Sequence, residues 1–141
     1  MNILVTGGTG FVGKALVEAL LSRGDSVTVL TRSIEKAQAI FPEKTLQFLA
    51  ALSTLKDLNG FDAVINLAGE PIFDKKWTAQ QKEKLRHSRI DLTQQLVQLI
   101  NQSEYPPALI SGSATGIYGN CGEDVITEDT NPSTQFTAQL C

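Results

Sequence analysis

Five short apolar segments are spread along the chain, and stretches with helical periodicity or turn residues separate them. These segments are nearly continuous hydrophobic runs rather than alternating ones, which is typical of parallel strands buried on both faces of a sheet. We therefore expect strands at residues 2–6, 26–31, 46–50, 61–68 and 108–111. The pattern is weakest in the third of these segments.

The stretches between the strands show the three- and four-residue spacing of amphipathic helices. Ser33 is placed to cap a short helix that ends near residue 40, before Pro42. An earlier helix follows residue 10 and ends at Gly24. Its apolar face is expected to consist of Phe11, Ala15, Leu16, Ala19 and Leu20.

A long helix is expected over residues 78–101, opening with Thr78 and Gln81, which fit a capping box. Another helix is expected to begin near Ser133. Strands that alternate with helices form βαβ units with right-handed crossovers. The sequence therefore predicts one α/β domain over residues 1–141, a doubly wound parallel sheet with five strands in the order 3-2-1-4-5.

Gly7, Gly10 and Gly13 form a G-x-x-G-x-x-G motif between the first strand and the first helix. The first glycine permits a tight turn, the second lets a pyrophosphate approach the backbone, and the third lets the helix pack closely on the strand. The amides at the helix N-terminus then face the phosphates. The alternative is an ordinary turn in which Gly13 is incidental. The context favours a Rossmann-like dinucleotide-binding domain whose first turn supplies Thr6, Gly7, Thr9, Gly10, Phe11, Val12 and Gly13.

The end of the second strand indicates which dinucleotide is bound. A carboxylate about 20 residues beyond the glycines would bind the ribose 2′-hydroxyl of NAD. Here the strand ends in Leu-Thr-Arg-Ser, without a carboxylate, and Arg32 is placed to pair with a 2′-phosphate. The alternative is that Arg32 is a solvated loop charge. We expect NADP(H), with NAD(H) as the second choice.

The net charge, the hydropathy and the cysteine content indicate which kinds of binding partner and which cellular compartment to expect. Twelve Lys and Arg against 15 Asp and Glu residues give a net charge of −3, so we expect no nucleic-acid partner. No apolar run approaches the ~18–20 residues that span a bilayer, and no secretory signal is visible, so we expect no membrane association. Cys121 and Cys141 form no metal-ligand or redox motif, which favours a reduced, cytoplasmic compartment and no bound metal.

Several motifs together resemble the extended short-chain dehydrogenase/reductases. Residues 6–13 resemble the first turn of that superfamily, and the Asn-Leu-Ala-Gly at 66–69 resembles its motif after strand four. Residues 111–119 look like the segment with its active-site serine, and Glu128 and Pro132 fit the stretch that follows. The elements at 69–72 and 77–93 are similar to a subfamily of NAD(P)-dependent or nucleoside-diphosphate-sugar epimerases.

This resemblance implies roles for residues beyond the first turn. Ala68 and Gly69 are expected in the cofactor site, and Ser113 is expected to hydrogen-bond a substrate oxygen near the nicotinamide. Tyr118 is expected either to contact the substrate or to anchor its loop. Members are usually about twice this length, and their C-terminal half completes the sheet and binds the substrate. We therefore expect an N-terminal portion, truncated before the substrate subdomain.

Arg89 departs from the resemblance, because an asparagine usually occupies this place. It completes the apolar stripe formed by residues 85, 92, 96 and 99, so it should point toward the cleft side of the sheet. We group Arg89 with the cofactor-binding residues, as a cation for a phosphate or a carboxylate. The alternative is an arginine that reaches past the strand edge into solvent. His87 and Glu70 are expected to be solvated.

The usual catalytic pair is missing. The superfamily uses Tyr-x-x-x-Lys, and its spacing from Ser113 falls on Phe136 and Leu140, neither of which titrates. The first hypothesis is an NADP(H)-dependent oxidoreductase or epimerase acting on a carbonyl or nucleotide-sugar-like small molecule. The second is an inactive NADP(H)-binding regulator or sensor, and the third is a structural remnant. We also expect a homo-oligomer, because the apolar face of the long helix would be partly uncovered.

Overall fold

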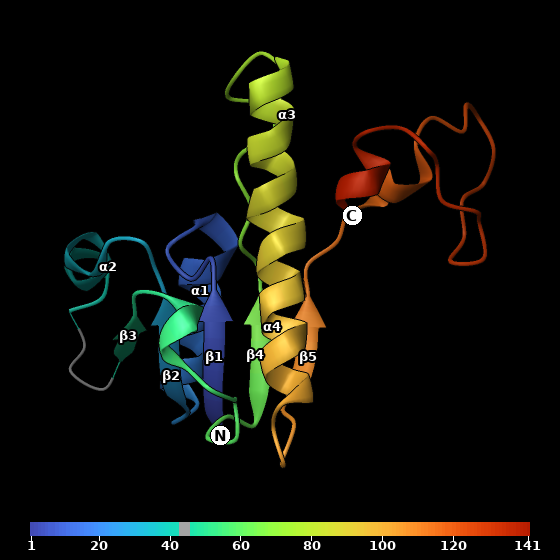
Figure 1. Ribbon diagram of the computed structural model, residues 1–141. Coiled ribbons are helices and arrows are strands. Elements are labelled where there is room, and N and C mark those ends of the chain that lie inside the picture. Colours follow the sequence, from blue (N-terminus) through green and yellow to red (C-terminus); the bar gives the residue numbers. More distant parts are fainter. Residues whose placement is uncertain (43–45) are drawn as a thin grey trace.

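The computed structural model describes residues 1–42 and 46–141, and its centre is a parallel sheet of five strands (Figure 1). The spatial order is β3-β2-β1-β4-β5, as the sequence predicts. The strands are shorter than expected at some ends: β1 Asn2–Thr6, β2 Ser26–Leu30, β3 Gln47–Leu49, β4 Ala63–Asn66 and β5 Ala108–Ser111. All five carboxyl ends therefore lie at one edge of the sheet.

The central strand β1 has a hydrophobic core on each of its faces. Ile3 and Val5 belong to one core, which includes side chains of the helix α1 (Phe11–Ser22). Leu4 belongs to the other, which includes side chains of α4 (Leu92–Asn101). Each fully buried aliphatic side chain contributes roughly 1.5–3 kcal/mol relative to an exposed one. The continuous apolar run of β1 is therefore explained by burial on both faces.

The predicted apolar face of α1 is only partly right: Leu20 is buried and Leu16 packs against the core. The buried side of the helix consists of Gly13, Val17 and Leu20, whereas Phe11 is 97% exposed and the two alanines of the predicted face are also exposed. The helix must place Gly13 against the turn that precedes it, and the i, i+4, i+7 spacing then brings Val17 and Leu20 to the sheet. The orientation of α1 is thus set by the glycine rather than by the larger apolar residues.

Helix α2 (Ile34–Ile40) begins as predicted, with the Ser33 hydroxyl accepting a hydrogen bond from the Lys36 amide (3.5 Å). The long helix is interrupted. It consists of α3 (Ala79–Arg86), a π-helical turn (His87–Asp91) and α4. Thr78 caps α3 by accepting from the Gln81 amide (3.2 Å), but the Thr78 amide donates to the Lys76 carbonyl, so only half of the predicted capping box forms.

The last strand and the segment after it differ from the predictions. Leu109 and Ile110 of β5 are 36% and 57% exposed, so this strand is not covered on both faces by the described residues. Beyond β5 the chain forms a 3₁₀ turn (Thr115–Tyr118), irregular loops and a second 3₁₀ turn (Ala138–Leu140) instead of a helix from Ser133. This segment leaves the carboxyl end of the sheet and returns beside α3 (Figure 1). Among the described residues, no helix is long and apolar enough to cross a bilayer.

We predict that Gly13→Ala lowers the free energy of unfolding by about 1–3 kcal/mol, the usual cost of overpacking. A Cβ on Gly13 would collide with the Gly7 carbonyl oxygen and lie 2.7 Å from the Gly8 Cα, and neither backbone atom has room to move. Urea denaturation followed by circular dichroism measures the change. The control is Gly60→Ala, where the added Cβ meets no atom within 4 Å. Equal stability of the two variants would contradict the close packing of α1 on the turn.

Candidate functional site

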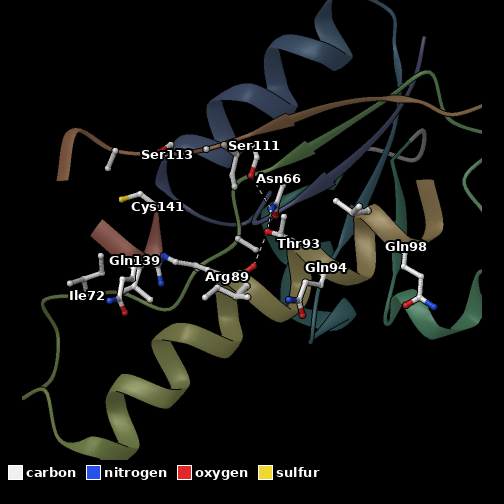
Figure 2. Close-up of a pocket in the computed structure, with 18 of the residues that line it drawn as sticks. Asn66, Ile72, Arg89, Thr93, Gln94, Gln98, Ser111, Ser113, Gln139 and Cys141 are labelled. Atoms are coloured by element: carbon white, nitrogen blue, oxygen red, sulfur yellow. Dashed lines mark hydrogen bonds between the residues drawn. The ribbon is translucent and has the colours of Figure 1, made fainter. Parts of the chain in front are cut away.

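Two cavities adjoin the carboxyl ends of the strands, where parallel sheets of this kind hold ligands, and one of them also extends along α4 as far as Gln102. The first, of about 850 Å³, lies between the first turn and the end of β2, and we call it the glycine-turn cavity. The second, of about 1020 Å³, lies between the α3–α4 region, residues 111–114 and residues 139–141, and we call it the β5 cavity (Figure 2). Leu67, Ala68 and Gly69 line both cavities and form a shared wall.

The first turn has the geometry that a pyrophosphate requires. Gly7 has a φ of +68°, and a Cβ there would lie 2.6 Å from the backbone of Leu67. Gly10 donates to the Gly7 carbonyl (2.9 Å) and forms the N-cap of α1, where no side chain accepts from the helix amides. The first amides of α1 therefore remain available to an anion.

The structure divides the predicted first-turn residues into two groups. Thr6, Gly7, Thr9 and Gly10 line the glycine-turn cavity, together with Ala68 and Gly69 from the shared wall. Phe11 lines neither cavity, and Val12 faces the β5 cavity. Gly13 lies beneath the turn, where it keeps α1 close to Gly7.

A basic edge lies at the end of β2. Arg32, Ser33 and Lys36 line the glycine-turn cavity there, and within the described part of the chain no ion pair joins Arg32 or Lys36 to an acidic group. Glu70 is the one acidic residue among the described residues that line this cavity, and its carboxylate pairs with Lys75 (3.3 Å). Sequence reasoning missed Lys36. The signal was its position in the first turn of a helix that begins directly after Arg32.

A hydrogen-bonded network centred on Asn66 connects β1, β4, β5 and α4. The Thr6 hydroxyl donates to Asn66 Oδ1 (2.6 Å), and Asn66 Nδ2 donates to the hydroxyls of Thr93 (2.9 Å) and Ser111 (3.2 Å). The Ala68 amide donates to Thr6 Oγ1 (3.2 Å), which attaches the shared wall to the same network. Because Asn66 is 5% exposed and fully partnered, it fixes the spacing of the strand ends. The sequence signal for this network was the polar residue at the end of three otherwise apolar strands, namely Thr6, Asn66 and Ser111.

The π-helical turn directs two side chains to the loop after β4. The Ser88 hydroxyl accepts from the Glu70 amide (2.9 Å), and Arg89 Nη1 donates to the Glu70 carbonyl (3.0 Å). The Thr93 hydroxyl donates to the Arg89 carbonyl (2.7 Å), as Figure 2 shows. Arg89 thus lies on the cleft side, as expected, and it lines the β5 cavity but not the glycine-turn cavity.

The residues with expected catalytic roles lie apart from one another. Ser113 lines the β5 cavity, close to Cys141 in Figure 2. Tyr118 is half-buried in its 3₁₀ turn and lines neither cavity. The Phe136 ring packs edge-on against Trp77 at 5.7 Å, with the Lys82 ammonium 5.2 Å from its centre. The side chain at the usual tyrosine position is thus an anchor for the C-terminal segment.

Other titratable side chains near the site are engaged at the surface. His87 is 62% exposed, and its ring nitrogens face Asp91 (2.5 Å) and Glu83 (3.6 Å), so it is a surface residue as expected. Glu70 is more buried than expected, with a side chain that is 21% exposed, and it pairs with Lys75. Across residues 1–42 and 46–141, no three His, Cys, Asp or Glu side chains lie where they could hold a metal ion together.

Comparison with known proteins identifies the family. Residues 3–139 match the sequence profile of the NAD dependent epimerase/dehydratase family. The chain belongs to this family. Among curated epimerase-family relatives, the chloroplastic SDR39U1 homolog of Arabidopsis thaliana is 38% identical to this chain. The match covers the whole of this chain and 42% of that relative. This chain is also 38% identical to YfhF of Bacillus subtilis, over 94% of the chain and 44% of YfhF. This epimerase/dehydratase-family chain therefore spans less than half the length of these two relatives.

Solved structures of similar proteins agree with the fold. The human epimerase family protein SDR39U1, solved with NADPH, superposes on 99% of the chain and 46% of that protein, with a TM-score of 0.81 and 29% identity. A nucleoside-diphosphate sugar epimerase from Corynebacterium glutamicum superposes on the whole chain and 28% of that protein, with a TM-score of 0.74 and 30% identity. The UDP-Glc/GlcNAc 4-epimerase of Campylobacter jejuni, at 18% identity and a TM-score of 0.81 over 99% of the chain and 45% of that protein, supports the fold alone.

Proposed function

We propose that this chain is the NADP(H)-binding domain of an oxidoreductase or epimerase that acts on a carbonyl or nucleotide-sugar-like substrate. The observation that carries the proposal is the glycine-turn cavity. A glycine turn at the N-terminus of α1 forms one end of it, and Arg32, Ser33 and Lys36 form the other. The presence of NADPH in the human SDR39U1 structure supports the same cofactor for this chain.

The residues fit such a cofactor by their chemistry. The amides at the start of α1 would hold the pyrophosphate, since Gly10 leaves the approach free of a side chain. The Arg32 and Lys36 cations and the Ser33 hydroxyl would hold the 2′-phosphate. When bound, NADP(H) supplies hydride transfer. The shared wall would hold it between the two cavities, and Ser113, which lines the β5 cavity, would hydrogen-bond a substrate oxygen there.

An inactive NADP(H)-binding regulator is the second candidate, and the Phe136 side chain favours it. Phe136 is packed against Trp77 and Leu140 is buried, so neither supplies the proton transfer that the superfamily's tyrosine and lysine perform. Tyr118 remains a proposed substitute, supported only by its proximity in sequence to Ser113. Self-association as a homo-oligomer is also proposed, supported by the exposed apolar side chains of Val97, Leu109 and Ile110.

The glycine turn gives the first prediction about binding. We expect Gly10→Val to raise the Kd for NADPH at least about tenfold, or about 1.4 kcal/mol, because the side chain would fill the space of the pyrophosphate. The φ of −77° at Gly10 is open to any residue, so the fold should be retained. Isothermal titration calorimetry measures the Kd, with Gly60→Val as the matched control. Unchanged affinity in Gly10→Val would refute the assignment of the turn.

The basic edge gives a prediction about cofactor choice. We expect Arg32→Ala and Lys36→Ala each to weaken NADP⁺ binding about fivefold while leaving NAD⁺ binding within twofold, because an exposed charge-assisted pair contributes about 1 kcal/mol. Lys56→Ala is the control, since this exposed lysine lines neither cavity. Parallel losses for both nucleotides, or none, would remove the argument for NADP specificity.

The packed Phe136 leads to a prediction about turnover. We expect the 141-residue chain to bind NADPH without oxidising it in the presence of aldehydes, ketones or nucleotide sugars, because general acid catalysis worth about 10²–10⁴-fold is absent. NADPH absorbance measures the rate. Turnover that persists on repurification and disappears in both Ser113→Ala and Tyr118→Phe would overturn this view and make Tyr118 the proton donor.

A further inference from the structure

The β5 cavity has one charged side chain among the described residues that line it, and this is Arg89. The other lining side chains are amides, hydroxyls, a thiol and apolar groups. Gln94 and Gln139 lie to either side of the arginine in Figure 2, and Gln98 lines the cavity farther along α4. A cavity of this kind offers many neutral hydrogen-bonding groups and a single positive charge.

The Arg89 guanidinium is held in place by one of its nitrogens. Nη1 donates to the Glu70 carbonyl (3.0 Å) and approaches Ser88 Oγ (3.4 Å) and the Leu85 carbonyl (3.5 Å). The rest of the group packs against Gly69, where an added Cβ would lie 2.8 Å from Cζ, 2.9 Å from Nη2 and 3.2 Å from Nε. The absence of a side chain at residue 69 thus gives the guanidinium its position beside the shared wall.

The opposite edge of the guanidinium has no partner. No hydrogen bond from Nε or Nη2 to another described residue is formed, and the only buried unpartnered side-chain nitrogen or oxygen in the described chain is Arg86 Nε. Arg89 Nε and Nη2 are therefore not completely buried, and the residue lines the β5 cavity. They form the planar pair of donors that binds a carboxylate through both oxygens.

The charge of Arg89 is not neutralised by the protein. Its hydrogen-bond partners are two carbonyls and a hydroxyl, which carry no charge. The nearby Glu70 carboxylate pairs with Lys75 instead, and Arg23 and the N-terminus share Asp25. A positioned, always-charged guanidinium without an acidic partner in a cavity favours an anionic ligand.

From this arrangement we infer that Arg89 binds the carboxylate of the substrate. The inference rests on the proposed NADP(H)-binding function and names the substrate class for its second cavity, a hydroxy or oxo carboxylate. One guanidinium with an unpartnered edge matches one carboxylate. The glutamines suit the neutral oxygens of the same molecule.

The test is a titration of the ¹⁵N-labelled chain with glycolate, followed through the Nε–H resonances of its arginines. The neutral glycolamide has the same shape, and inorganic phosphate distinguishes a general oxyanion site from a carboxylate site. Each titration is done with and without saturating NADP⁺. The variants are Arg89→Gln, Arg89→Lys and, as a matched control, Arg32→Gln in the other cavity.

We expect a saturable shift of the Arg89 Nε–H resonance with glycolate and none with glycolamide. Arg89→Gln should weaken glycolate binding at least about tenfold, and Arg89→Lys less, while NADP⁺ affinity stays within twofold. Arg32→Gln should show the reverse pattern. Absence of a shift at Arg89, an equal shift with glycolamide, or tighter binding of phosphate would overturn the inference. Glycolate binding at Arg89 without NADP⁺ binding would refute the proposed function alone.

Discussion

The structure depends on a contact between backbones that only glycine permits. Gly7 presses on the backbone of Leu67, and Gly13 presses on the carbonyl of Gly7, so the end of β1, the loop after β4 and the start of α1 meet without side chains between them. Everything at the site is placed relative to this contact. It aims the free amides of α1 at the glycine-turn cavity, and it presses the first turn against the start of the shared wall.

Hydrogen bonds to α4, β5 and the π-helical turn hold the segment that contains the shared wall. Asn66 connects it to α4 and β5 through Thr93 and Ser111, while Ser88 and Arg89 hold the backbone of Glu70. The π-helical turn makes this possible, because a widened turn changes which residues of one helix face a given neighbour. Two cavities with different chemistry therefore share one wall: one has a basic rim, and the other has a single positioned arginine among amides.

Much of the fold could be predicted because the physical signals were local. Continuous apolar runs gave the strands, and the glycine spacing gave the first turn, since each depends on adjacent residues. The face of α1 could be predicted only in part from its apolar residues, because Gly13 overrides them through contact with Gly7. The π-helical turn leaves no clear mark in a helical pattern. Lys36 and Asn66 had local signals in the sequence, but their partners in the site come from segments distant in sequence. Arg89 was predicted to face the cleft, but which cavity it lines was decided by Gly69.

The pairing of β1 also has a consequence for the order in which the protein folds. A short crossover connects β1 to β2, and their pairing begins at Asn2 and Ser26. The other neighbour of β1 is β4, where Ile3 pairs with Ala63, about 60 residues later in the chain. Closing the longer loop costs more chain entropy, and contacts so distant in sequence form late. The β1–α1–β2 unit can assemble first, but Gly7 meets Leu67 only when β4 docks. We therefore expect the nucleotide turn to be completed only when β4 docks, in a late step of folding.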